Sequence, residues 1–247
     1  MKIALCLSGQ IRNAISHAYP FIQKNILDGN DVDIFLHTWK SEGNIDASFY
    51  KSNALYKNED IMDCLSLLNP KLFIIEESNI QWKIKNEQVK PKQRKNYQSQ
   101  YYSMQKSFEL KSQYENSRCI KYDFCIRSRY DFAINKKINF LDLDKTKLYC
   151  VDSPRYDDPD SNLHGAFNDQ FWIASSNNCD SIAKLFEKHD YLYAKYNLPL
   201  DCGPEAPLYK LVVNDLNIDI EAIEDYEHPF LPNMSVGMAS PNSIIRI

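Results

Sequence analysis

Motifs that identify several large enzyme classes are absent from this chain. The loop after the first apolar run, Ser8-Gly9-Gln10-Ile11-Arg12-Asn13, has a single glycine. A dinucleotide fingerprint needs several glycines so that the backbone can approach a pyrophosphate, and the pattern Gly-X-X-X-X-Gly-Lys does not occur. His-Glu-X-X-His and Gly-X-Ser-X-Gly are missing as well. These absences disfavour nicotinamide enzymes, P-loop ATPases, zinc proteases and serine hydrolases.

The chain also lacks a surplus of basic residues. Its 29 Lys and Arg residues are outnumbered by 33 Asp and Glu residues, which gives a formal net charge of −4. This balance argues against a protein that coats nucleic acid or an anionic membrane through a general basic surface. We therefore expect no nucleic-acid partner, and we expect any bound phosphate to be held by a local group of arginines.

Paired cysteines and long hydrophobic runs are missing too. The seven cysteines are scattered, with no Cys-X-X-Cys pair, so we expect buried, reduced thiols in a reducing compartment. No segment is long enough to span a bilayer, and the short apolar run at residues 1–7 meets Ser8-Gly9-Gln10 without a cleavage pattern. We therefore expect a soluble cytoplasmic protein without a transmembrane segment.

What the chain does contain is an alternation of strand-like and helix-like segments. We predict strands at 3–7, 32–37, 72–76, 122–126, 148–151, 171–174 and 218–223, and helices at 14–26, 60–68, 101–114, 181–189 and about 204–213. Residues 83–100, rich in Lys, Gln and Asn, are predicted to form a surface loop. This alternation indicates an α/β fold with a central, mostly parallel sheet flanked by helices. We expect a single domain over residues 1–247, with an irregular tail at 228–247.

The most informative segment is an apolar strand that ends in charged residues. It runs from Tyr122 to Ile126 and continues into Arg127, Arg129 and Asp131. Open α/β sheets bind ligands outside the carboxyl ends of their strands. Two guanidinium groups there can hold a diphosphate, and the carboxylate can hold a divalent cation or a sugar hydroxyl. The alternative is a structural salt bridge between Asp131 and one of the arginines.

Two other segments carry candidate binding residues. Ser8, Gly9, Gln10 and Arg12 follow the first strand, where doubly wound folds contact nucleotides, although Arg12 fits a solvated turn equally well. Asn168-Asp169-Gln170 leads into an apolar strand and suits a hydroxyl-rich ligand. An Asx turn before the strand is the alternative for this second segment.

A third segment supplies a candidate general base. In Gly203-Pro204-Glu205, the proline suits the first turn of a helix, so Glu205 is predicted at the helix start, where its negative charge is stabilised. A carboxylate held ionised can accept a proton, but the same dipole lowers its basicity. Ordinary complementation of the helix dipole is the competing interpretation.

Taken in order, five motifs resemble those of a known family: Ile3-Ala4-Leu5-Cys6-Leu7-Ser8-Gly9-Gln10-Ile11-Arg12, Asp33-Ile34-Phe35-Leu36-His37-Thr38-Trp39, Ile126-Arg127-Ser128-Arg129-Tyr130-Asp131, Asn168-Asp169-Gln170-Phe171 and Gly203-Pro204-Glu205. They look like the motifs of glycosyltransferase-like proteins from bacterial surface-polysaccharide gene sets, similar to the WavE lipopolysaccharide-synthesis group. The resemblance covers most of the chain. It implies a GT-A-like (Rossmann-like) nucleotide-sugar-binding domain.

One departure from the GT-A pattern concerns the metal. In that fold an Asp-X-Asp motif usually ends a central strand and holds a metal ion on the donor diphosphate, whereas this chain has Arg129-Tyr130-Asp131. The resemblance implies Mn²⁺ or Mg²⁺ bound by Asp131 and by His228, the candidate histidine near the C-terminus. The extra arginine offers another way to neutralise the departing diphosphate.

The resemblance implies transfer of a sugar from a nucleotide-diphosphate donor to a hydroxyl of a surface glycan, with a glycan or lipid-linked glycan as acceptor. Arg127 and Arg129 would stabilise the diphosphate, with Ser8, Gly9, Gln10, Arg12, Asp131 and Asn168 as further donor-binding residues. Asp169 would orient the donor sugar or the acceptor, and Glu205 would be the base if the reaction inverts. Two alternatives stay open: transfer of another nucleotide-activated group, and an inactive nucleotide-sugar- or glycan-binding module.

Overall fold

The structure is a computed structural model that describes residues 1–11, 14–40, 60–77, 91–151, 154, 165–199 and 202–223. Of residues 17 and 91–96 only the backbone is described. The strands are β1 (Lys2–Gly9), β2 (Asp31–Lys40), β3 (Leu72–Glu77), β4 (Phe124–Ser128), β5 (Leu148–Cys150), β6 (Phe171–Ser175) and β7 (Ile220–Ala222). The α-helices are α1 (Tyr19–Ile22), α2 (Ile61–Leu68), α3 (Pro91–Arg118), α4 (Ser176–Ile182), α5 (Leu185–Lys195) and α6 (Glu205–Tyr209). π-Helical segments are η1 (Ala14–Ala18), η2 (Gln23–Leu27) and η4 (Lys210–Asp215), and η3 (Phe140–Asp142) is a 3₁₀-helix.

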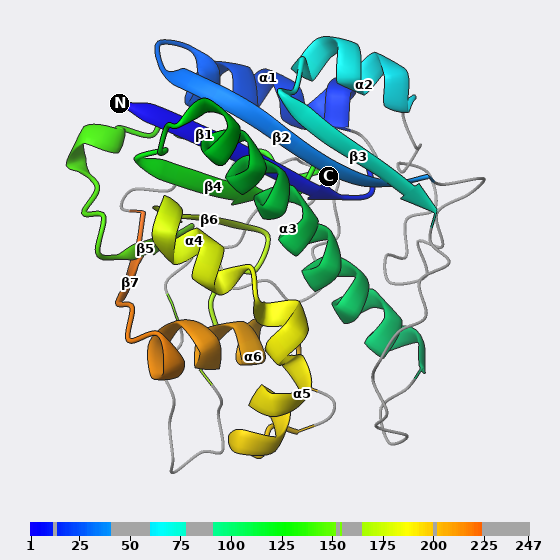
Figure 1. The fold of residues 1–247 in the computed structure, drawn as a ribbon, viewed down its shortest axis with the longest axis vertical. Helices are drawn as coiled ribbons and strands as arrows, with labels where there is room; N and C mark the ends of the chain where they lie inside the picture. The colour runs from blue at the N-terminus through cyan, green and yellow to red at the C-terminus, as the bar shows by residue number, and fades with distance from the viewer. Residues whose placement is uncertain are drawn as a thin grey trace, which may run out of the picture.

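The strands form one mixed, mostly parallel sheet in the order β3-β2-β1-β4-β6-β5-β7 (Figure 1). Paired neighbours are parallel except for β6, which runs antiparallel to both β4 and β5. The predicted α/β class and mostly parallel sheet are confirmed. The reversal of β6 brings its first residues to the sheet edge where β4 ends.

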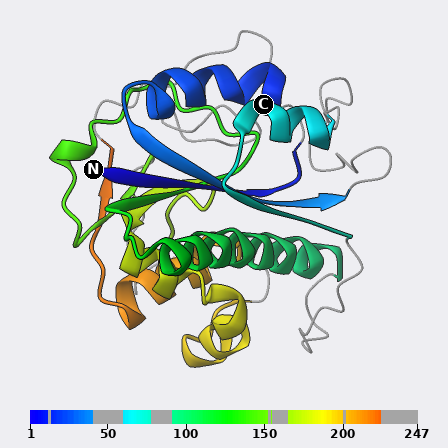
Figure 2. The ribbon, with the colours of Figure 1, turned by 45° about the horizontal axis from the view of Figure 1, so that its top comes forward.

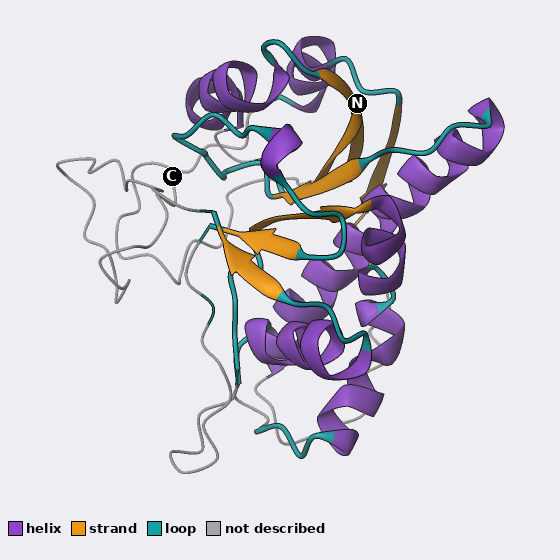
Figure 3. Ribbon diagram, turned by 90° about the vertical axis from the view of Figure 1, so that its left-hand side faces the viewer, coloured by secondary structure: helices purple, strands orange, loops and turns teal. Residues whose placement is uncertain are grey.

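Helices cover both faces of the sheet, and the alternation of side chains along the strands explains why. Leu5 and Leu7 of β1 join a core with η1, α1, η2 and α2, while Ala4 and Cys6 join a second core with α3, α4, α5, α6 and η4. Figure 2 shows α1 and α2 on one face and α3 on the other. From the side, the strands lie between these helical layers (Figure 3). Both faces are therefore buried, as expected for a mostly parallel sheet.

Three predicted elements were wrong in their boundaries. The strand predicted at 122–126 is β4 at Phe124–Ser128, so Arg127 lies within the strand and not beyond its end. Helix α3 begins at Pro91, about ten residues before the predicted start, and so takes in part of the expected loop at 83–100. Lys, Gln and Arg are good helix formers, and proline is favoured in a first helical turn, so this polar segment extends the helix. The predicted helix at 181–189 is instead the end of α4 and the start of α5. Helix α4 begins earlier because the Ser175 side chain caps it by accepting a hydrogen bond from Asn178 N at 3.4 Å.

An ion network centred on the buried side chain of Lys111 anchors α3. Lys111 Nζ donates to Glu115 at 3.0 Å, to Ser176 at 2.7 Å and to Asp180 at 2.5 Å. Lys121 Nζ donates to Glu115 at 2.9 Å and to Asp180 at 3.1 Å. We call Lys111, Glu115, Lys121 and Asp180 the Lys111 network. It ties α3 to α4 and thereby fixes the helix over the sheet.

No helix within the described ranges combines the length and apolar character that crossing a membrane requires. The predicted irregular tail at 228–247 lies outside the described residues.

Candidate functional site

The strand order creates one point where the chain changes direction across the sheet. From β1 the chain adds β2 and then β3 on one side, and it later places β4 on the other side of β1. Leu7 of β1 pairs with Ser128 of β4, and Ser128 also pairs with Phe171 of β6. The loop after β1, the loop after β4 and the segment before β6 therefore meet. In open α/β sheets such a switch point is the usual place for a ligand.

In the first of these three segments, the loop after β1, the described residues carry no charged side chain, so their backbone conformation matters most. Gly9 has φ +116°, a conformation that residues with side chains rarely adopt, so glycine is needed at the end of β1. Ser8 is buried, and its Oγ has no hydrogen-bond partner among the described residues. Gln10 follows Gly9 at the strand end. Arg12, the charged candidate of this loop, lies outside the described residues.

Arg127 lies behind the site, because its side chain is only 1% exposed. Its Nη1 donates to the Gln170 carbonyl oxygen at 3.0 Å, whereas its Nε has no hydrogen-bond partner among the described residues. Burial lowers the pKa of Arg127 to about 10, while the nearby carboxylates of Asp169 and Asp131 favour its charge. Arg127 thus ties β4 to the segment before β6.

Arg129 and Asp131 form the ion pair that the alternative interpretation of this segment anticipated. Arg129 Nε donates to Asp131 Oδ1 at 2.8 Å, and Nη2 donates to Oδ2 at 2.6 Å. The Arg129 side chain keeps 18% exposure, compared with 5% for Asp131. Backbone N–H of Arg129 also donates to the Gln170 carbonyl, at 3.0 Å. The edge of the Arg129 guanidinium that binds this carboxylate can also bind a phosphate, because both anions accept a bidentate pair of hydrogen bonds.

The segment before β6 has one turn-forming residue and one carboxylate held by α3. Asn168 Oδ1 accepts the backbone N–H groups of Gln170 at 2.9 Å and Phe171 at 3.2 Å, which is the Asx turn given above as the alternative. Asp169 is buried, and its Oδ2 accepts a hydrogen bond from Gln100 Nε2. The sequence did not reveal Gln100, because it lay in the segment predicted to be a loop.

Tyr101, the next residue of α3, contacts the backbone just before Glu205. The buried Tyr101 hydroxyl donates to the Pro204 carbonyl at 2.7 Å. Burial raises the pKa of Tyr101 well above its usual value, and the nearby Asp169 and Glu205 carboxylates raise it further. Consecutive residues of α3 therefore contact one predicted catalytic carboxylate, Asp169, and the residue before the other, Glu205. No feature of the sequence had marked Tyr101 for this position.

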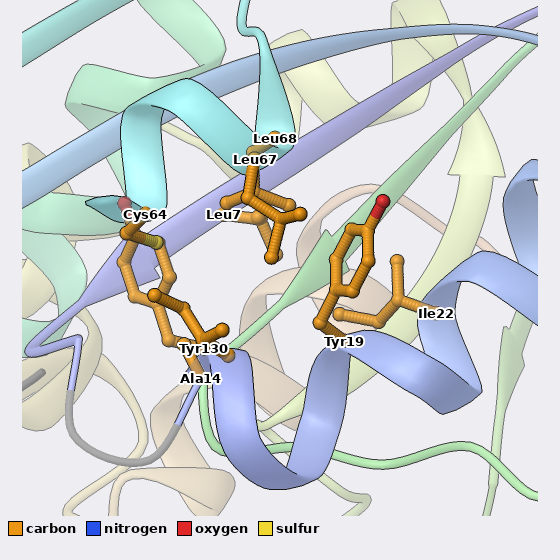
Figure 4. A pocket seen from close by; sticks show the side chains of 9 residues that line it. Leu7, Ala14, Tyr19, Ile22, Cys64, Leu67, Leu68 and Tyr130 are labelled. Atoms are coloured by element: carbon orange, nitrogen blue, oxygen red, sulfur yellow. The ribbon is translucent and has the colours of Figure 1, made fainter. Parts of the chain in front are cut away.

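A small pocket lies on the face of the sheet opposite α3, and it is not part of this site. It lies between η1, α1 and α2 and is lined by Leu7, Ala14, Ile15, Tyr19, Ile22, Cys64, Leu67, Leu68 and Tyr130 (Figure 4). These residues carry no charge, so the pocket offers nothing to a phosphate. Tyr130 lies between Arg129 and Asp131 in the chain and anchors both. Its ring lines this pocket, and its hydroxyl donates to the His37 carbonyl at 3.2 Å.

A comparison with protein families matches residues 1–185 to the family described as Domain of unknown function (DUF7796). The chain belongs to this family. The DUF7796 match includes the ends of β1 and β4 and the start of β6, whereas Glu205 lies beyond it. A search of curated proteins finds none that matches.

Of the two predicted metal ligands, Asp131 and His228, the structure describes Asp131 alone. Among the described residues, no three His, Cys, Asp or Glu side chains are grouped as a metal site. Asp131 is engaged by Arg129, and His228 lies outside the described residues. Asp131 supplies the kind of oxygen ligand that Mn²⁺ or Mg²⁺ takes, so its part in a metal site stays a prediction.

Proposed function

We propose that the protein is a glycosyltransferase that moves a sugar from a nucleotide-diphosphate donor to a hydroxyl of a surface glycan. The observation that carries this proposal is the Arg129–Asp131 ion pair just beyond the end of β4, beside the segment that holds Asp169, since Arg129 N donates to the carbonyl of Gln170. A guanidinium and carboxylates at a switch point suit a ligand with both a diphosphate and hydroxyl groups. The fold we propose is of the GT-A type, in a cytoplasmic protein.

Donor binding begins with an exchange of partners at Arg129. The charges of Arg127, Arg129, Asp131 and Asp169 cancel, so a diphosphate finds no spare positive charge while the Arg129–Asp131 pair stays closed. Arg129 therefore turns its bidentate face from Asp131 to the diphosphate, where it stabilises the negative charge that develops as the sugar leaves. Asp131, once released, accepts from the ribose or sugar hydroxyls. A Mn²⁺ or Mg²⁺ ion bound by Asp131 would supply further positive charge against the diphosphate.

The remaining carboxylates act on the sugar and the acceptor. Asp169, oriented by Gln100, accepts hydrogen bonds from hydroxyl groups and so fixes the sugar relative to the diphosphate. If the transfer inverts the configuration at the sugar carbon, Glu205 takes the proton from the attacking acceptor hydroxyl, whose oxygen replaces the nucleoside diphosphate at that carbon. Ser8, Gly9, Gln10, Arg12 and Asn168 complete the donor site, and a glycan or lipid-linked glycan is the acceptor.

Turnover of a donor tests the proposal. The purified protein is first screened by thermal shift against nucleotide-sugars, with and without manganese, because a ligand that binds only the native state raises the melting temperature. Each donor that shifts the melting temperature is then incubated with glycan acceptors, and the release of nucleoside diphosphate is measured. The proposal predicts release that depends on the acceptor. Stabilisation without turnover would identify a binding module, and transfer of a non-sugar group would identify the other alternative.

A further inference from the structure

The carboxylate of Glu205 lies directly over the α-carbon of Gly203. A β-carbon built on Gly203 would collide with Glu205 Oε2 and would lie 3.3 Å from Cδ and 3.8 Å from Oε1. Any residue other than glycine would place its first side-chain atom where the carboxylate now lies. The position of the carboxylate therefore depends on the missing side chain two residues earlier.

The backbone around this carboxylate is tied to two helices. The Tyr101 hydroxyl of α3 donates to the Pro204 carbonyl at 2.7 Å, and Cys202 Sγ donates to the Tyr193 hydroxyl of α5 at 3.5 Å. Ala206 N also donates to the Gly203 carbonyl at 3.4 Å. These contacts fix the segment at 202–206 relative to α3. Because Gln100 of α3 holds Asp169, consecutive residues of one helix locate both candidate carboxylates.

We infer that Gly203 is a positioning residue, which holds the Glu205 carboxylate toward the acceptor hydroxyl by having no side chain. This inference rests on the proposed function. It does not rest on backbone strain, because the described glycines with positive φ are Gly9 and Gly29 and do not include Gly203. The substitution Gly203→Ala would press on the end of a flexible side chain, which can swing away. The carboxylate is then displaced while the fold is kept.

Gly165 provides a matched contrast. A β-carbon there would collide with the ring of Tyr209, which is buried. Overpacking a buried ring lowers stability. Gly165→Ala is therefore expected to lower the melting temperature, whereas Gly203→Ala leaves it within about 2 °C.

Crystal structures of the unmodified protein and Gly203→Ala test the positioning directly, without any donor. We expect the Glu205 carboxylate to leave its place over residue 203 while the backbone at 202–206 is unchanged. A carboxylate that stays in place would overturn the inference, as would a backbone that moves instead.

A double-mutant cycle then relates the displacement to transfer. Gly203→Ala should lower kcat about tenfold or more with the donor KM within about twofold, and it should add no further loss in a Glu205→Gln background. Normal kcat for Gly203→Ala beside an impaired Glu205→Gln would reject the role of Gly203 and leave the proposed function standing, and additive losses would reject it too. Normal kcat for Glu205→Gln would instead reject the assignment of the base.

Discussion

The molecule holds two groups of four charges with the same composition and different surroundings. The Lys111 network and the group at the switch point, Arg127, Arg129, Asp131 and Asp169, each contain two cations and two carboxylates. In the Lys111 network the three donors of Lys111 Nζ are all used, and Glu115 Oε1 also accepts from Tyr122 N at 2.9 Å. At the switch point Arg127 Nε has no hydrogen-bond partner among the described residues. Hydrogen bonding, and not the number of charges, distinguishes the two groups.

The effects on pKa agree with this contrast. Burial opposes the charge of Lys111, but its interactions with Cys125 and with the carboxylates of Asp180 and Glu115 raise its pKa above the usual value. Burial lowers the pKa of Arg127 to about 10 despite its acidic neighbours. The two groups also lie at opposite ends of β4. The Lys111 network lies where β4 begins, and the group at the switch point lies where β4 ends. We conclude that the Lys111 network stabilises the fold, and the contrast supports our proposal that the group at the switch point binds a ligand.

The largest expected effect is the loss of Lys111. Lys111→Met should lower the free energy of unfolding by about 3–5 kcal/mol, because it leaves Glu115 and Asp180 without their buried cation and with only the half-exposed Lys121 as a partner. Urea denaturation measures the loss. Lys106→Met on the same helix is the control, since the Lys106–Glu109 pair is partly exposed and should contribute less than about 1 kcal/mol. Equal losses for the two variants would show that the Lys111 network stabilises the fold no more than a partly exposed ion pair does.

Substitutions of the two proposed catalytic carboxylates should affect kinetics more than stability. Glu205→Gln should reduce kcat by about a hundredfold while the donor KM stays nearly constant, because a general base acts in the chemical step. Asp169→Asn should instead raise the KM for donor or acceptor. Steady-state kinetics with an identified donor makes the measurement. An Asp169→Asn enzyme without turnover, beside a nearly normal Glu205→Gln enzyme, would reverse the two roles.

Acid should weaken the Lys111 network. Burial would raise the pKa values of Glu115 and Asp180, but hydrogen bonds, including those from Lys121, lower both below their ordinary values of 4.5 and 3.8. Their contribution is therefore complete above about pH 4.5 and is lost as the pH falls through the lowered folded-state values. Urea midpoints measured from pH 7 to pH 2 should fall less steeply with acid in Glu115→Gln than in the unmodified protein. Identical slopes would show that Glu115 does not contribute.

The smallest expected effect belongs to the exposed member of the same network. The Lys121 side chain is 48% exposed, so water screens its pairs with Glu115 and Asp180. Lys121→Ala should cost less than about 1 kcal/mol in urea denaturation. A loss as large as that of Lys111→Met would mean that burial does not determine how much each cation contributes to the free energy of unfolding.

The sequence was sufficient for the strands and insufficient for the contacts between distant segments. Apolar runs such as 3–7 and 171–174 predict buried strands because burial on both faces requires continuous apolar residues. The run at 171–174 does not predict the antiparallel direction of β6, because a buried strand has the same apolar pattern in either direction. The Arg129–Asp131 pair was foreseeable as an alternative, since its members are two residues apart. The contacts of Gln100 with Asp169 and of Tyr101 with Pro204 depend on how α3 lies across the sheet.

The most direct test of our central claim is calorimetric titration of nucleoside diphosphates, with the corresponding nucleosides as controls. The uridine, cytidine, guanosine and adenosine compounds are titrated into the unmodified protein, Arg129→Ala and Lys121→Ala. For a diphosphate that binds the unmodified protein, Arg129→Ala should lose about tenfold or more in affinity, because it removes charge-assisted hydrogen bonds to phosphate. Its affinity for the nucleoside should be unchanged, and Lys121→Ala should bind both normally. Equal losses for diphosphate and nucleoside in Arg129→Ala, or no diphosphate binding by the unmodified protein, would contradict the account.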